Sequence, residues 1–176
     1  MAALPPPTRQ VASNHPPGAG AGAAATHVAY VAIGANLGDA RCAVADAMDA
    51  LDALPHCRVD ARSSLYRSAP VDAGGPDFIN AVVRLHTSLE PLDLLDQLQA
   101  IEQRAGRERP YRNAPRTLDL DLLEVQGVRL DTPRLTLPHP RMHERAFVLL
   151  PLAEIAPGRV GQDALASVAQ QRIERL

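Results

Sequence analysis

The pattern of apolar and polar positions predicts that ordered structure begins near Val28 with a buried strand. The run VAYVAIG is almost continuously apolar and ends in Gly34, which is typical of a strand covered on both faces. Apolar residues at helical spacing follow, and Pro55 ends this predicted helix. The apolar positions of the helix are Val44, Met48, Leu51 and Leu54.

Beyond Pro55 the pattern predicts two extended segments, a second helix and another strand. The extended segments cover 59–66 and 78–86, and a loop rich in Pro and Gly separates them. Pro91 stands at the start of the second helix, whose buried stripe consists of Leu94, Leu98 and Ile101. A strand over 117–125 is then expected to turn through Gln126 and Gly127 into a hairpin.

The C-terminal third predicts a helix near Glu144 and a weakly amphipathic helix over 163–173. The order strand, helix, strand, strand, helix, strand is that of an α+β, ferredoxin-like split βαβ sandwich, here with an additional C-terminal hairpin and helices. This fold hosts many functions, so it does not identify one by itself.

Composition indicates a single globular domain preceded by a disordered arm. Residues 1–26 are rich in Pro, Gly and Ala and carry one charge, Arg9, so we expect them to be disordered and residues 27–176 to form the domain. The arm lacks the basic start and apolar run of a secretory signal, which makes the cytoplasm the expected location, with an organellar transit segment as the alternative. Cys42 and Cys57 are expected to be buried free thiols in a reducing compartment.

Charge and aromatic content argue against a general nucleic-acid binder, and no apolar run is long enough to cross a membrane. The net charge is −2 and aromatic residues make up 3% of the chain. All eighteen basic residues are Arg, and nine of them lie between Arg104 and Arg145. This local basic stretch requires its own explanation.

The segment RTLDLDLL places two carboxylates on one face of a strand. With a period of two, the leucines face one side while Asp119 and Asp121 face the other. Adjacent carboxylates repel each other unless a cation lies between them, and oxygen ligands at this spacing suit Mg²⁺ held together with substrate phosphates. The alternative is a solvated strand face without a ligand.

Five arginines precede this strand in a segment that Gly106, Pro110 and Pro115 prevent from being helical. They are Arg104, Arg107, Arg109, Arg112 and Arg116. Guanidinium groups bind phosphates, so a polyphosphate with its metal explains the arginines and the paired acids together, although solvated surface is the alternative for such a loop. Downstream, Arg134, His139 and Arg145 recur around two prolines, where the histidine could also be incidental. The chain has no lysine, which excludes a Walker A site.

These residues resemble the 6-hydroxymethyl-7,8-dihydropterin pyrophosphokinase family of folate biosynthesis. The family signature around the paired acids is matched from Arg112 to Leu123, and the likeness extends from AIGANLGD through FINAVV to LPHPRMHERAFVLLPLAEIAP, over about 130 residues. Some relatives carry Trp and Lys where this chain has Asn113 and Pro110, and Tyr111 is a possible substitute for the Trp.

The resemblance implies transfer of a pyrophosphoryl group from ATP to the hydroxymethyl group of the pterin, leaving AMP. It implies two Mg²⁺ ions on Asp119 and Asp121, and catalytic arginines Arg107 and Arg109 that close over the phosphates. The implied ATP-binding residues are Gln99, Glu102, Arg116, Arg134, Thr136, His139 and Arg145. The implied pterin-binding residues are Ser68, Ala69, Val71, Phe78, Asn80 and Phe147. We expect a cytoplasmic monomer whose partners are ATP and the pterin, with no nucleic acid and no membrane.

Two other functions fit parts of the pattern. A palm-like nucleotidyltransferase or cyclase also places paired acids on a ferredoxin-like sheet, but it would release pyrophosphate rather than AMP. An RNA-binding module would use the arginine loop as a clamp and would need aromatic residues on the sheet face. Tyr30, Tyr66 and Phe78 do not form such a motif.

Overall fold

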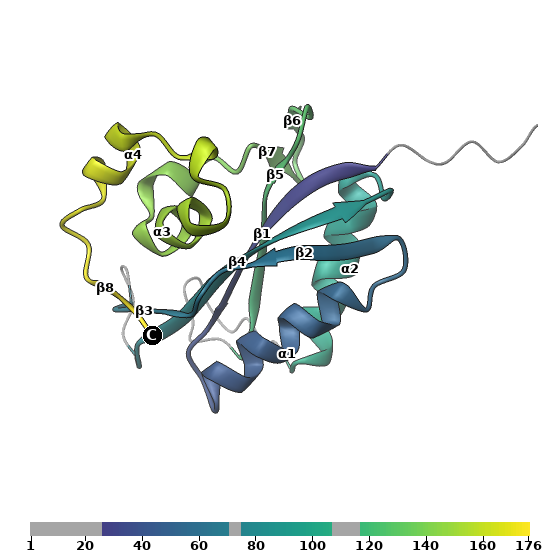
Figure 1. Cartoon of the computed structure of the whole chain (residues 1–176). Helices are drawn as coiled ribbons and strands as arrows, with labels where there is room; N and C mark the ends of the chain where they lie inside the picture. The colour runs from purple at the N-terminus through teal and green to yellow at the C-terminus, as the bar shows by residue number, and fades with distance from the viewer. Residues whose placement is uncertain (1–25, 71–74, 107–116) are drawn as a thin grey trace, which may run out of the picture.

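A computed structural model describes residues 26–70, 75–106 and 117–176 and shows an antiparallel sheet with helices on both faces (Figure 1). The strands of this sheet are β1 (His27–Ala35), β2 (Cys57–Arg62), β3 (Tyr66–Ser68), β4 (Phe78–Thr87), β5 (Asp119–Val125) and β8 (Ile173–Arg175). The helices are α1 (Ala40–Asp52), α2 (Pro91–Arg104), α3 (Ala146–Ile155) and α4 (Gln162–Ser167). A separate two-stranded ribbon consists of β6 (Leu130–Asp131) and β7 (Thr136–Leu137).

The strands follow the order β5-β1-β4-β3-β8, and β2 also pairs with β4. β1 and β4 are the long central strands, and both neighbours of β1 run antiparallel to it. β2 and β3 together replace the single extended segment that the sequence predicted over 59–66. They lie one after the other along β4, because residues 63–65 leave the strand conformation between them.

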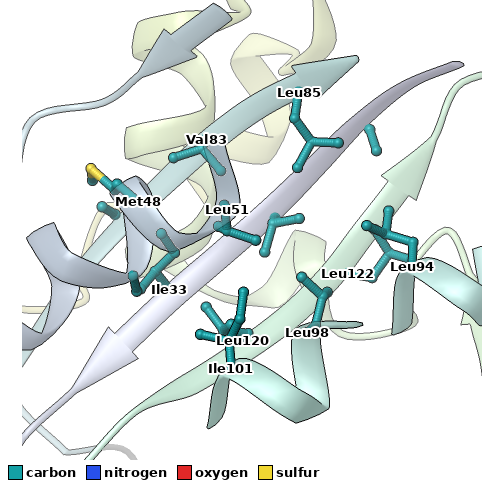
Figure 2. Close-up of a cluster of buried hydrophobic side chains, with 14 of the residues drawn as sticks. Ile33, Met48, Leu51, Val83, Leu85, Leu94, Leu98, Ile101, Leu120 and Leu122 are labelled. Carbon is teal, nitrogen blue, oxygen red and sulfur yellow. The ribbon is translucent and has the colours of Figure 1, made fainter. Parts of the chain in front are cut away.

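Helices α1 and α2 pack on one face of the sheet and enclose the larger apolar cluster (Figure 2). Asp39 caps α1 by accepting a hydrogen bond from the backbone N–H of Cys42 at 3.0 Å, and Pro91 occupies the first turn of α2. The predicted helix stripes are confirmed: Val44, Met48, Leu51, Leu94, Leu98 and Ile101 are all buried. Because the leucines of β5 belong to this cluster, the cluster fixes which face of β5 points toward α1 and α2.

The opposite face of the sheet is covered by α3, which is apolar around most of its surface (Figure 1). A second cluster forms here, in which Val148, Leu149 and Leu152 of α3 pack on Tyr30 and Val82 of the sheet. α3 begins at Ala146, after a 3₁₀ turn (Met142–Glu144), so the helix predicted near Glu144 is present but starts two residues later.

Three sequence predictions are wrong. The turn at Gln126 and Gly127 forms, but β6 after it pairs with β7 and not with β5, so it does not close a hairpin. The helix predicted over 163–173 ends at Ser167, because the chain turns and Ile173 enters β8 beside β3.

The third concerns the cysteines. Both are free, as expected, but Cys42 is exposed on the solvent side of α1 and Cys57 is only partly buried. No helix in the described ranges is long and apolar enough to cross a membrane.

Candidate functional site

The paired carboxylates of β5 lie on the sheet face that carries α3. Leu118, Leu120 and Leu122 point into the cluster under α1 and α2, so the predicted alternation is confirmed and Asp119 and Asp121 point the other way. In the sheet register Asp119 pairs with Gly34 and Asp121 with Ala32. The two carboxylates are two residues apart on one strand face, which places their Cα atoms about 6.5 Å from each other.

Glu102 of α2 holds the backbone between these two aspartates. Its Oε1 accepts a hydrogen bond from the N–H of Leu120 at 2.7 Å, and the residue is only 3% exposed. α2 packs against β5, so this contact connects the helix to the strand at the residue between the two aspartates. The described contact of Glu102 is therefore with the backbone that positions Asp119 and Asp121.

Arg145, at the start of α3, is a cationic neighbour of the acid pair. Its Nη1 lies 3.7 Å from Oδ2 of Asp121, and its guanidinium carbon lies 5.5 Å from the ring centroid of Phe147. The guanidinium is half-buried and oriented by a carboxylate and an aromatic face together. It is thus placed to meet a second anion beside Asp121.

His139 belongs to the same group of charges. Burial, and then the charges of Arg145 and Arg141, lower its pKa against the opposing effect of Asp121. The backbone N–H of Arg141 donates to Nδ1 at 3.2 Å, so the neutral ring carries its proton on Nε2. Its own backbone N–H donates to the carbonyl of Leu123 at 2.7 Å, which holds the residue against β5. The side chain can therefore offer a neutral N–H to an oxygen atom near Asp121.

Several of the predicted pterin residues gather at the ends of β3 and β4. Asn80 donates from Nδ2 to Oγ of Ser68 at 2.9 Å, and both residues are buried. Ser68 pairs in register with Phe78. Asn80 also pairs with Gly34, whose missing side chain leaves room for it, since a Cβ there would lie 3.3 Å from Asn80 Oδ1. Asn80, Gly34 and Asp119 thus follow one another across the sheet.

Asn36 connects the end of β1 to the segment before β4. Its Nδ2 donates to the carbonyl of Pro76 at 3.1 Å, and the residue is 4% exposed. Neither Gly34 nor Asn36 was predicted as a site residue, although both lie in the AIGANLGD motif. The signal available in the sequence was a glycine and an asparagine at the end of an apolar run.

The remaining ATP-site predictions lie around the edge of this region. Arg134 is at the tip of the β6-β7 ribbon and forms an ion pair with Asp96 of α2. Thr136 lies on β7, where its Oγ1 donates to Asp131 at 3.4 Å. Gln99 is exposed on α2, one turn before Glu102. No described contact joins these three residues to the carboxylates.

Four predicted site residues, Val71, Arg107, Arg109 and Arg116, lie outside the described residues. Gln99 and Glu102 belong to α2 and Arg134 and Thr136 to the β6-β7 ribbon. The remaining predicted residues form two neighbouring groups on the sheet face that carries α3. Charged groups surround Asp119 and Asp121. Phe78 and Asn80 lie two strands away on β4, and Ser68, which Ala69 follows directly, lies one strand further on β3. Phe147 contacts Arg145 and so lies beside the first group.

The donor set on β5 fits a hard divalent cation that keeps part of its coordination open. Among the described residues, no group of three or more His, Cys, Asp or Glu side chains could hold a metal ion. Two carboxylates alone leave several positions of an octahedral ion to water and to ligand oxygens, which is how Mg²⁺ binds together with phosphates. The residues present therefore fit Mg²⁺ bound with a polyphosphate rather than a closed structural metal site.

Comparison with known proteins places the chain in a family. Residues 30–157 match the family model for 7,8-dihydro-6-hydroxymethylpterin-pyrophosphokinase. A Pseudomonas aeruginosa protein named 2-amino-4-hydroxy-6-hydroxymethyldihydropteridine pyrophosphokinase is 49% identical over 154 residues, which cover 84% of this chain and 95% of that protein. A Bacillus subtilis protein of the same name is 42% identical over 130 residues, covering 73% of this chain and 78% of the relative.

Solved structures show the same fold at lower identity. A Plasmodium falciparum HPPK-DHPS crystal structure with pteroate has a TM-score of 0.57 at 13% identity, covering 76% of this chain and 40% of that one. A second HPPK-DHPS structure, in complex with substrates, has a TM-score of 0.57 at 14% identity, covering 80% of this chain and 42% of that one. The chain spans about two fifths of these longer proteins, which support the fold alone. On the family model and the two relatives, this chain belongs to the 7,8-dihydro-6-hydroxymethylpterin-pyrophosphokinase family, whose members are diphosphokinase enzymes.

Proposed function

We propose that this chain transfers a pyrophosphoryl group from ATP to the hydroxymethyl group of 6-hydroxymethyl-7,8-dihydropterin, in folate biosynthesis. The hydroxymethyl oxygen forms a bond to the β-phosphorus, and the bond from that phosphorus to the α-β bridging oxygen breaks, leaving AMP. The observation that carries the proposal is the row of register partners Asp119, Gly34 and Asn80, which sets a carboxylate pair beside a buried amide on one face. A relative named for this pterin is 49% identical over most of the chain.

In this proposal Asp119 and Asp121 hold two Mg²⁺ ions against the triphosphate. When bound, the ions neutralise phosphate charge and make the β-phosphorus a better electrophile. The role of the carboxylates is to orient the nucleotide over β5, and Glu102 supports them by fixing the backbone of Leu120.

Arg145 and His139 then supply cationic and neutral donors to the phosphates. Arg145 lies next to Asp121 and is held by Phe147, so it can exchange one carboxylate oxygen for a phosphate oxygen with little movement. We also assign Gln99, Thr136, Arg134 and Arg116 to the nucleotide, and Arg107 and Arg109 to closure over the phosphates, as the family resemblance implies.

The pterin is proposed to bind near Ser68, Ala69, Phe78 and Asn80, with Val71 and Phe147 completing the pocket. Nδ2 of Asn80 is directed toward Ser68, which leaves Oδ1 on the side of Gly34 as an acceptor for ring N–H groups. The aromatic rings of Phe78 and Phe147 supply flat apolar surface for the ring system.

The proposed fold type rests on the strand order of the main sheet, and the proposed domain bounds, location and partners rest on the sequence. The strand order β5-β1-β4-β2, with crossover helices on one face, supports a ferredoxin-like assignment. A single domain over 27–176, a cytoplasmic monomer, and the lack of nucleic-acid and membrane partners stay predictions.

The direct test identifies the nucleotide product. The purified chain is incubated with ATP and MgCl₂, with and without the pterin alcohol, and the nucleotides are separated by ion-exchange chromatography. AMP formed in equal amount with the pterin diphosphate, and only when pterin is present, is the expected result. Release of inorganic pyrophosphate without a pterin product would instead indicate a nucleotidyltransferase or cyclase. An Asp121→Asn variant serves as the control for contaminating kinases.

A further inference from the structure

A very short strand of the main sheet, β3, forms one wall of the proposed pterin pocket. β3 has three residues, and its last residue is Ser68, the partner of Asn80. Its pairing with β4 alone would leave so short a strand at the sheet edge, where pairing is weak. β8, at the C-terminus, pairs with β3 on its other side, and Leu176 N–H donates to the carbonyl of Leu65 at 2.9 Å. The pocket wall is therefore an interior strand only because the C-terminal segment covers it.

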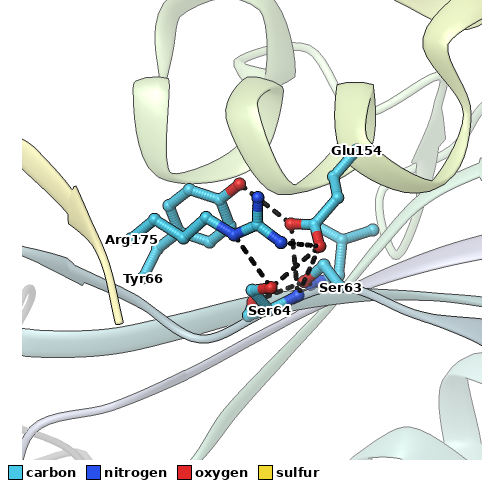
Figure 3. A network of polar contacts seen from close by, with 6 residues as sticks. Ser63, Ser64, Tyr66, Glu154 and Arg175 are labelled. Carbon is cyan, nitrogen blue, oxygen red and sulfur yellow. Dashed lines mark hydrogen bonds and ion pairs between the residues drawn. The ribbon is translucent and has the colours of Figure 1, made fainter.

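The carboxylate of Glu154, on α3, accepts hydrogen bonds from the β3 region and from β8 (Figure 3). Its Oε1 accepts from the Ser64 hydroxyl at 2.8 Å and from Nη2 of Arg175 at 3.0 Å, and its Oε2 accepts from the Tyr66 hydroxyl at 2.9 Å. The backbone N–H of Ser64 also donates to the carboxylate, at 3.1 Å, and Arg175 Nε donates to Ser64 Oγ at 3.0 Å. One carboxylate thus connects β3, the residues before it, β8 and α3.

Two of the connected segments, β3 and α3, carry proposed pterin contacts. β3 carries Ser68, and α3 carries Phe147 at its other end, about 10 Å from Glu154 along the helix axis. In the sheet register Tyr66 pairs with Asn80 on one side and with Arg175 on the other. The row that contains Asp119, Gly34 and Asn80 therefore continues through Tyr66 to Arg175.

The pKa shifts of Glu154 and Tyr66 indicate that both side chains have favourable hydrogen-bond partners in this network. Burial by itself raises the pKa of Glu154, but hydrogen bonds from Ser64 and Tyr66 and the charge of Arg175 outweigh it and leave the pKa below its ordinary value. Burial, and then the bond to Glu154, raise the pKa of Tyr66 to about 12. Glu154 is thus charged and Tyr66 neutral over the whole physiological range, so the contacts do not switch with pH there.

We propose that Glu154 and Arg175 are positioning residues for the pterin pocket, which fix β3 at a set distance from α3 and so hold Ser68 and Asn80 in place. The proposal rests on the proposed function, because it assigns these residues to the pterin half of that site. Neither side chain belongs to the groups assigned to substrate. Their effect passes through Ser64 and Tyr66 into the backbone of β3.

The test compares two variants of the network with a matched ion pair elsewhere on the same side of the sheet. Glu154→Ala and Arg175→Ala remove the network, and Arg175 is exposed enough that its variant should fold. Arg159→Ala is the control, because Arg159 forms a 2.8 Å ion pair with Glu124 at a distance from β3 and lies over the ring of Tyr30. Initial rates are measured against pterin and against ATP, with thermal melting of each protein.

Both network variants are expected to raise the KM for pterin by about five- to ten-fold, with kcat and the KM for ATP within two-fold of wild type. Arg175→Lys should restore part of the pterin KM, since it keeps one donor to Glu154. Arg159→Ala should leave both KM values unchanged. Equal effects on both substrates, or a lower melting temperature with unchanged KM values, would show a merely structural role.

The two proposals fail in different ways. A wild-type protein that is active while both network variants match Arg159→Ala overturns the positioning role only. A wild-type protein that forms no AMP and shows no binding of the pterin by fluorescence titration overturns the proposed function and the positioning role together.

Discussion

Variants of Glu102 can distinguish two roles for this residue: a direct contact with the nucleotide, or support of the Asp119 and Asp121 pair. The family resemblance assigns it to ATP, whereas in the structure it is buried and accepts a hydrogen bond from the backbone of Leu120 between Asp119 and Asp121. Glu102→Ala removes the acceptor. Glu102→Gln keeps an oxygen in the same place and removes only the charge, so the two variants separate the hydrogen bond from the electrostatics.

The magnitude of the effect depends on what Glu102→Ala leaves buried. A buried backbone N–H without a partner costs about 1–3 kcal/mol, and truncating the side chain adds the lost packing of its γ-methylene, about 1 kcal/mol. The free energy of unfolding should therefore fall by about 2–4 kcal/mol, which corresponds to a melting temperature lower by roughly 4–16 °C for a protein of this size. Glu102→Gln should lose less than half of this.

The assay combines urea unfolding with kinetics at varied Mg²⁺ and fixed ATP. If Glu102 supports β5, Glu102→Ala should be destabilised and should need several-fold more Mg²⁺ for half-maximal rate, because its carboxylates are less well placed. Gln103→Ala, on the exposed side of α2, is the control for helix effects. The reasoning is refuted if Glu102→Ala is as stable as Gln103→Ala, or if Glu102→Gln keeps full stability but loses ATP affinity, which would be the behaviour of a direct nucleotide contact.

Four further outcomes are expected. Asp121→Asn should lower AMP formation at least 100-fold while melting within about 3 °C of wild type, because it removes a proposed metal ligand from a strand face rather than from the core. Gly34→Ala should raise the KM for pterin several-fold and cost about 1 kcal/mol in urea unfolding, since its Cβ would press on Asn80. Tyr66 has a pKa of about 12 in the folded protein and about 10 when unfolded, so its contribution to stability is complete below pH 10 and is lost as the pH rises toward 12. Between these pH values the melting temperature should therefore fall less steeply for Tyr66→Phe than for the wild type. Arg134→Ala should weaken ATP binding in equilibrium titration with little change in single-turnover rate, as for a preformed contact.

The parts of the fold with a clear apolar period could be predicted from the sequence. The stripe of α2 and the alternation of β5 both follow from side-chain spacing, and burial selects one orientation for each. The pairing partner of the strand after β5 could not be derived in this way, because Gln126 and Gly127 specify a turn but not the strand that pairs after it, and the predicted hairpin is absent. In the structure Leu130 pairs with Leu137 instead.

The C-terminal strand shows a second limit. Ile173 was included in a helix because the apolar residues before it fit a weak helical period. Three residues are too few to show a strand period. The pairing of β8 depends on β3, which is more than a hundred residues earlier in the chain, and on Glu154, which is about twenty residues earlier. Long-range partners of this kind leave no local signal.

At the site, the sequence predicts which types of residue are present, but it does not predict which of them lie together in space. Two acids on one strand face predict a cation, and arginines predict phosphate, because each follows from charge and from a spacing of two. The relation between Asp119 and Asn80 depends instead on the register of β1 with both β5 and β4, which aligns them through Gly34. A shift of one residue in either pairing would turn one of the two side chains to the opposite face of the sheet. The leucines of β5 and the alternating apolar residues of β1 therefore do more than form a core: by fixing the register, they set the proposed nucleotide and pterin contacts side by side on the face covered by α3.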